Sequence, residues 1–257
     1  MQPGWSIRRD FLPADLKPLL DQAGLDGCVA VQARQSREET RFLLELADES
    51  SIVKGVVGWV DLRSENVDRE LAEWSAHPRF VGVRHVLQDE PDDQLMLRPE
   101  FLRGIGKLAA YDLAYDILIF PRHLPFAVEL VRRFPEQRFV LDHVAKPFIK
   151  DGLVEPWSKD MRALAGEPNV CCKVSGMVTE ASWDGWKEAD FRPYLDVALE
   201  CFGEDRLMFG SDWPVCTLAG TYEQVHGIVA HWLDGMSART REKILGENAG
   251  RFYRLKS

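Results

Sequence analysis

The sequence predicts an α/β fold of the (β/α)8 TIM-barrel type, in which seven of the eight strands can be read from the chain. Two observations support this prediction. Short runs of apolar and β-branched residues alternate with longer segments of helical period, which is typical of parallel strands joined by crossover helices. Successive strands also begin roughly 25 to 35 residues apart, the length of one strand–loop–helix unit. Because no Pro/Gly/Ser-rich linker interrupts this series, we expect a single domain over residues 1–257.

Seven segments have the composition of buried strands. They are Gly27–Ala33, Val53–Leu62, Phe80–Val86, Ala114–Phe120, Arg138–Val144, Val170–Gly176 and Arg206–Asp212. The amphipathic segments Glu38–Glu49 and Pro125–Phe134 would cover the outside of the sheet as helices. The first readable element is a helix, Pro13–Ala23, so the first strand of the barrel is expected to be missing. A doubly wound sheet would alternate in the same way, but no G-x-G-x-x-G motif follows the first strand.

Composition and charge exclude several classes of protein. A formal net charge of −9 without a basic cluster argues against a nucleic-acid partner. The five cysteines form no C-x-x-C pair, which favours a reducing compartment, with the cytoplasm as the expected location. Residues 1–10 lack the apolar core of a signal peptide, and no apolar run approaches the roughly 20 residues of a membrane span. We therefore expect no membrane association, and no sequence feature specifies an oligomeric state.

Polar residues at the ends of apolar strands are the candidates for catalysis, because the active sites of α/β barrels lie at the carboxyl ends of the strands. Asp212 ends the last strand, and a carboxylate there can act as a general base toward water or bind a metal. His143 ends an earlier strand, on the same side as Leu141 and Phe139, and can polarise a carbonyl or shuttle a proton. The structural alternatives are an Asp that caps a helix or stabilises a turn and a His that packs in the core.

Arg84, His85 and Lys173 also lie at strand ends and could hold a carboxylate or a ring oxygen of a substrate. Neighbouring Arg84 and His85 must face opposite sides of a regular strand, so one of them is expected to be structural. The chain has no G-x-S-x-G elbow, no phosphate-binding loop and no Cys-His motif. Water is therefore the expected nucleophile.

Five motifs and the C-terminal segment resemble the fuconolactonase-like branch of the amidohydrolase superfamily. The motifs are Gly58-Trp59-Val60-Asp61-Leu62, Gly82-Val83-Arg84-His85, Asp142-His143-Val144-Ala145-Lys146-Pro147, Lys173-Val174-Ser175-Gly176 and Phe209-Gly210-Ser211-Asp212-Trp213-Pro214, followed by Gly246-Glu247-Asn248-Ala249-Gly250-Arg251-Phe252-Tyr253. The resemblance implies a barrel enzyme that hydrolyses sugar-derived or aromatic-derived lactones. It implies that Asp212 activates water and that His143 is the carbonyl or metal partner. Trp59, together with the strand-end residues Arg84, His85 and Lys173, is expected to contact the substrate.

The chain departs from this family at its beginning. The family starts with a strand that ends in His-x-His, whereas the first histidine here is His77. A catalytic zinc site needs about three protein ligands, so a divalent ion such as Zn²⁺ on His143 and Asp212 is a weaker expectation than lactone hydrolysis. A reading frame that starts at an internal methionine is favoured over a true loss of the strand, because such a loss would leave two sheet edges unpaired.

The working hypothesis is the opening of a sugar-derived or related carboxylated lactone by water that Asp212 activates. His143, with Arg84 or Lys173, would stabilise the developing oxyanion. Two alternatives stay open. The same barrel could catalyse decarboxylation or amide hydrolysis, because loops rather than strands select the substrate. The chain could also be an inactive homologue, shortened at its N-terminus, that binds a sugar acid without turnover.

Overall fold

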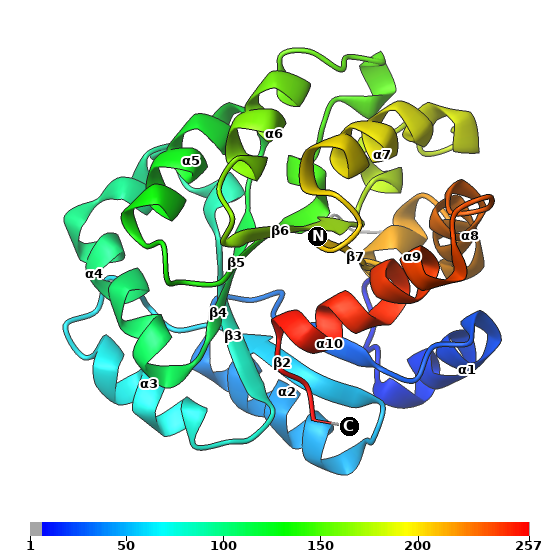
Figure 1. Cartoon of the computed structure of the whole chain (residues 1–257). Coiled ribbons are helices and arrows are strands. Elements are labelled where there is room, and N and C mark those ends of the chain that lie inside the picture. Colours follow the sequence, from blue (N-terminus) through cyan, green and yellow to red (C-terminus); the bar gives the residue numbers. More distant parts are fainter. Residues whose placement is uncertain (1–6, 257) are drawn as a thin grey trace.

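The computed structural model describes residues 7–256, and its centre is one seven-stranded parallel sheet in which the strands follow each other in chain order. Figure 1 shows this sheet curled, with helices around its outer side. The predicted α/β barrel-type fold and its seven strands are therefore confirmed for the described residues. The strands are β1 Cys28–Val31, β2 Val53–Gly58, β3 Phe80–Val86, β4 Ala114–Leu118, β5 Phe139–Leu141, β6 Val170–Val174 and β7 Leu207–Phe209.

The α-helices that lie between successive strands in the chain cover the convex side of the sheet (Figure 1). Local capping explains where some of them begin: the Ser36 hydroxyl accepts a hydrogen bond from the backbone N–H of Glu39 at 3.2 Å, which starts α2. The helices are α1 Pro13–Ala23, α2 Arg37–Glu49, α3 Val67–Ser75, α4 Pro99–Leu108, α5 Leu124–Arg133, α6 Trp157–Ala165, α7 Glu188–Phe202, α8 Tyr222–Trp232, α9 Ala238–Glu242 and α10 Asn248–Phe252.

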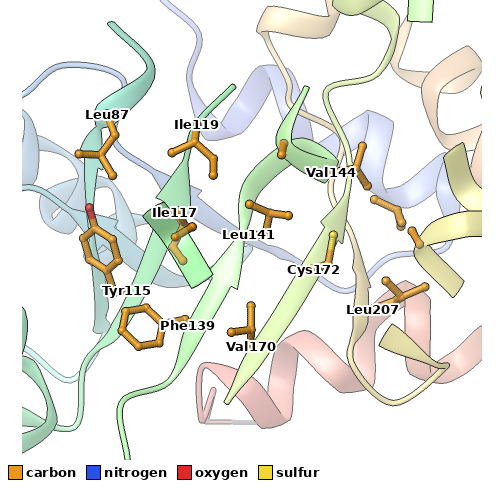
Figure 2. Close-up of a cluster of buried hydrophobic side chains, with 14 of the residues drawn as sticks. Leu87, Tyr115, Ile117, Ile119, Phe139, Leu141, Val144, Val170, Cys172 and Leu207 are labelled. Carbon is orange, nitrogen blue, oxygen red and sulfur yellow. The ribbon is translucent and has the colours of Figure 1, made fainter. Parts of the chain in front are cut away.

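The main core lies between the sheet and the helices. Every second strand residue points into it, as the two-residue period of a strand requires. Figure 2 shows part of this layer, including Tyr115 and Ile117 of β4, Phe139 and Leu141 of β5, and Cys172 of β6. The residues between them point to the concave side, and this is where the polar side chains of the site are found.

The concave side also holds a smaller apolar cluster that involves the C-terminal segment. Val57, Val81, Val140 and other strand residues pack there against Phe252 and Tyr253. The α10 helix therefore lies against the inner face of the sheet rather than in the outer helical layer. Leu255 continues this contact, because its side chain packs over Gly55 of β2.

The predicted strands were too long in six of seven cases, mainly at their carboxyl ends; only Phe80–Val86 matches β3. The reason is that the backbone leaves the extended conformation soon after the last ladder hydrogen bond. His143 was expected within a strand, but β5 ends at Leu141 and His143 lies two residues beyond it, with φ 54°. Asp212 likewise follows β7, with φ 54°.

Within residues 7–256, no helix is both long and apolar enough to cross a membrane. The expectation that residues 1–10 carry no signal peptide falls largely on residues 1–6, which lie outside the described residues. The expectation of one domain over residues 1–257 stays a prediction.

The packing of the outer core leads us to expect that replacing a buried phenylalanine by alanine lowers the free energy of unfolding much more than replacing an exposed one. Phe139 is fully buried and contacts the Tyr115 ring edge to face, with centroids 6.1 Å apart. We expect Phe139→Ala to lower the free energy of unfolding by about 3–5 kcal/mol, because it leaves a cavity. Phe42 on α2 is 46% exposed, so Phe42→Ala is the control, with a change within about 0.5 kcal/mol. Guanidinium denaturation measures both, and equal losses would contradict this packing.

Candidate active site

His143 and Asp212, from loops that follow β5 and β7, meet at one point. The His143 Nε2 and Asp212 Oδ1 atoms are 3.6 Å apart, and the two side chains are 10% and 17% exposed. Solvent therefore reaches a pair that is otherwise enclosed. The structure brings the two predicted catalytic residues together, while their catalytic roles stay a prediction.

A left-handed turn aims His143 away from the strand direction. Residues 143–146 have φ angles between 46° and 58°, a conformation that costs L-residues about 1–2 kcal/mol each. Two hydrogen bonds hold the turn: the Lys146 N–H donates to the His143 carbonyl at 2.7 Å, and the buried Trp157 indole donates to the Val144 carbonyl at 2.7 Å. Such strain persists where the surroundings fix it, and it is found most often at functional sites.

The Ser175-Gly176 pair after β6 fixes the His143 ring. His143 Nδ1 lies 2.8 Å from the Ser175 hydroxyl. The ring packs directly on Gly176, where a Cβ atom would lie 2.5 Å from the His143 ring. Burial lowers the pKa of His143 below its ordinary value, although the Asp212 carboxylate acts in the opposite direction. A neutral imidazole thus presents its Nε2 atom to Asp212.

A buried network of charges lies on the concave face of the sheet. The Lys173 ammonium is 2.5 Å from an oxygen of Asp116 and 2.7 Å from one of Asp142, and Arg84 donates to Asp142 at 2.9 Å. The Tyr253 hydroxyl completes it by donating to Asp116 at 2.8 Å. Burial alone would raise the pKa of Asp142, but Lys173 and Arg84 together hold it well below its usual range. Two cations thus face two carboxyl groups, and the network joins β3, β4, β5 and β6.

Arg84 and Lys173 were expected to contact substrate, and the structure gives both of them carboxylate partners inside this network. Arg84 is further tied to β1, because its guanidinium donates to the Gln32 carbonyl and the Gln32 amide donates to the Arg84 carbonyl at 3.2 Å. Direct contact of either cation with substrate stays a prediction.

Trp59 and His85 form a separate pair. The Trp59 indole donates to His85 Nδ1 at 3.2 Å, and His85 Nε2 lies 2.7 Å from a Glu90 oxygen. The His85 ring also contacts Phe101 of α4 edge to face, at 5.6 Å between centroids. Arg84 and His85 therefore face opposite sides of β3, as expected. Because the side-chain hydrogen bonds of Trp59 and His85 are with each other and with Glu90, their role in substrate binding stays a prediction.

A second ion pair lies beside the His143–Asp212 pair. Lys146 Nζ is 3.6 Å from Glu180 Oε1, and it also lies over the Phe120 ring at 5.7 Å from the centroid. Glu180 ends the short helix Val178–Glu180. Burial raises the pKa of Glu180, and the nearby Asp212 carboxylate adds to this rise. The sequence alone gives neither residue a role: Lys146 is one position of the motif that begins at Asp142, and Glu180 carries no sequence signal.

The described residues do not by themselves fit a tightly held zinc ion. Within residues 7–256, no group of three or more His, Cys, Asp or Glu side chains is arranged to hold a metal. His143 and Asp212 supply two ligands, whereas a catalytic zinc is usually held by three protein side chains and water. The two residues are the best candidates for part of such a site.

A curled parallel sheet with polar side chains meeting beyond the carboxyl ends of its strands is the arrangement of the α/β-barrel enzymes. Comparison with known proteins identifies the family among them. The family described as Amidohydrolase matches residues 1–255, so the chain belongs to the amidohydrolase family and is a hydrolase. This confirms the resemblance that its motifs indicated.

Two relatives and one solved structure show how similar this chain is to known proteins. An L-fucono-1,5-lactonase of Burkholderia multivorans is 42% identical over 260 residues, which cover 97% of this chain and 88% of the relative. An L-rhamnono-gamma-lactonase of Scheffersomyces stipitis is 23% identical over 205 residues, 68% of this chain and 59% of the relative. A crystal structure of a Burkholderia multivorans amidohydrolase with bound zinc superposes with a TM-score of 0.93 at 42% identity, covering 96% of this chain and 90% of that one.

The charge network predicts that Lys173 is needed for stability. We expect Lys173→Met to lower the free energy of unfolding by about 3–5 kcal/mol, because it leaves two buried carboxyl groups without their shared cation. Lys17→Met is the matched control: Lys17 pairs with Asp21 at 2.8 Å on the surface, with both side chains more than half exposed, and its removal should have little effect. Urea denaturation compares the two, and a small effect of both would contradict a buried network.

Proposed function

We propose that this protein hydrolyses a sugar-derived lactone, with Asp212 as the general base and His143 as the residue that polarises the lactone carbonyl. The distance of 3.6 Å between His143 Nε2 and Asp212 Oδ1, at a point that solvent reaches, is the observation that carries the proposal. The names of the two lactonase relatives support the substrate class. They favour lactone hydrolysis over decarboxylation, amide hydrolysis or binding without turnover.

The proposed reaction proceeds in two steps. Asp212 accepts a proton from a water molecule, and the water oxygen attacks the lactone carbonyl carbon. The carbonyl oxygen gains negative charge and accepts a hydrogen bond from His143 Nε2. The bond from the carbonyl carbon to the ring oxygen then breaks, and Asp212 returns its proton to that oxygen. The products are a hydroxyl group and a carboxylic acid on one open chain, which together contain the lactone and one water.

Ser175 supplies the tautomer that this mechanism needs. We assign the hydrogen bond of 2.8 Å so that the Ser175 hydroxyl donates to His143 Nδ1. The ring proton of the neutral imidazole then lies on Nε2, where it can be donated to the substrate oxygen. Gly176 leaves the space in which the ring takes this orientation.

The proposal also covers a bound divalent metal ion and the cellular compartment of the protein. A divalent ion such as Zn²⁺ on His143 and Asp212 is an alternative prediction, in which His143 Nε2 would be a ligand rather than a hydrogen-bond donor; the bound zinc in a similar crystal structure supports it. We also infer that the protein works in a reducing compartment such as the cytoplasm, because all five cysteines are free. Its proposed partner is a small lactone or sugar acid.

Substitution of the proposed base tests the function. We expect Asp212→Asn to reduce kcat by about 10²- to 10⁴-fold on a panel of five- and six-membered aldonolactones, because the amide cannot accept the proton from water. Asp234→Asn is the control, since Asp234 is a largely exposed surface residue. Acid release followed with a pH indicator measures both. Undiminished activity of Asp212→Asn would overturn the assignment.

The pH dependence tests the state of His143. Burial lowers the pKa of His143 below its ordinary value of 6.5, so the imidazole stays neutral to a more acidic pH than a free histidine does. We expect the acid-side decrease of kcat/KM, where the ring becomes charged, to be centred below pH 6.5. A pH-rate profile at low substrate concentration measures this. A decrease centred at pH 6.5 or above would be inconsistent with a buried, neutral histidine.

A further inference from the structure

Lys146 and Glu180 lie on the segments that follow β5 and β6, next to the residues of the proposed catalytic pair. Lys146 belongs to the same left-handed turn as His143, and its N–H donates to the His143 carbonyl. Glu180 ends the helix Val178–Glu180, which packs against the helix Val215–Leu218 that follows Asp212. The pKa of His143 responds to Lys146, and that of Glu180 responds to Asp212, because the charges lie close together. The ion pair is therefore part of the wall of the same site.

The Lys146–Glu180 ion pair leaves hydrogen-bonding groups of both side chains unused. The 3.6 Å between Lys146 Nζ and Glu180 Oε1 exceeds the length of a normal hydrogen bond. Neither group makes a shorter side-chain hydrogen bond to another residue in the range 7–256. The two side chains are 17% and 22% exposed, so both are mostly withdrawn from solvent yet still reach it. Ammonium protons and carboxylate oxygens remain available to a ligand.

The position of Lys146 beside Glu180 is not explained by a gain in the stability of the folded protein. For a mostly buried ion pair with 3.6 Å between its atoms, the cost of removing both charges from water offsets much of their attraction. Lys146 has a φ angle of 51°, a left-handed conformation that costs about 1–2 kcal/mol for a residue with a side chain. The backbone therefore holds an ammonium group at the site without a matching gain from its own ion pair.

The chemistry of the two groups matches that of a diol. An ammonium group only donates hydrogen bonds and a carboxylate only accepts them. Two neighbouring hydroxyl groups can satisfy both, one by accepting from Lys146 and the other by donating to Glu180. The Phe120 ring beside Lys146 offers an apolar surface for the C–H groups between the hydroxyls.

We propose that Lys146 and Glu180 form a diol-binding subsite, which recognises two neighbouring hydroxyl groups of the lactone and makes the enzyme selective for polyhydroxylated lactones. This inference rests on the proposed lactone hydrolysis. It assigns a role in substrate selection, not in the chemical step, to the two residues.

The test compares an aldonolactone with deoxy-lactones of the same ring that lack one hydroxyl group each. We expect the wild-type protein to prefer the aldonolactone over at least one deoxy-lactone by about 10- to 100-fold in kcat/KM, the effect of losing a hydrogen bond to a charged group. Lys146→Met and Glu180→Gln should bring this ratio close to one, mainly by raising KM for the aldonolactone. Lys146→Arg, which keeps a cationic donor, should restore part of the preference.

Lys150→Met is the matched control, because Lys150 is exposed and lies only four residues along the chain. It should leave the ratio unchanged, and thermal denaturation should show that all variants fold. An unchanged ratio in folded Lys146→Met and Glu180→Gln would overturn the diol subsite, as would the absence of any preference in the wild type. Failure of the wild type to hydrolyse any lactone would instead overturn the proposed function, so the two failures are distinguishable.

Discussion

The ion pair between Lys173 and Asp142 is the constraint on which the site depends. Asp142 follows the last residue of β5 and is the first residue of the turn that carries His143 and Lys146. Its fully buried carboxylate is held at 2.7 Å by an ammonium group from the next strand. Because a buried charge without a partner costs several kcal/mol, the start of the turn is fixed to β6. The positions of the His143 and Lys146 side chains on that turn follow from this attachment.

The two faces of the sheet have different roles: the convex face forms the apolar core, and the concave face carries the charged residues. The convex face carries aromatic and aliphatic side chains that pack against the helices, as the residues of Figure 2 show. The concave face carries the charge network, closed from the other side by Phe252 and Tyr253. A β-bulge contributes to this division, since the pairing of β2 with β3 skips Val81. The extra residue lets both Val81 and Arg84 reach the concave face, although they are three positions apart.

The fold and the central pair could be predicted from the sequence because both leave strong signals. The seven strands are apolar runs at regular spacing, and His143 and Asp212 lie two and three residues beyond the ends of two of them. The ends of the strands could not be predicted, because residues 143–146 and Asp212 are not glycines and yet adopt positive φ angles that tertiary contacts impose. The partners of the two cations were also missed: no sequence pattern marks Asp116 in β4 or Asp142 just after β5, and only the folded structure shows that both carboxylates lie against Lys173. Glu180 reaches the site from a loop, where no periodicity indicates it.

The carboxylates of Asp212 and Glu180 at the site have a consequence for the end of each catalytic cycle. A lactone enters as a neutral molecule, but its open-chain product ionises and carries a negative charge. That charge then lies near two carboxylates, in a protein whose formal net charge is −9. Like charges in a partly enclosed site repel more strongly than they do in bulk water. In the proposed reaction, the two carboxylates therefore repel the product while the single Lys146 ammonium attracts it, and the net repulsion favours product release over rebinding.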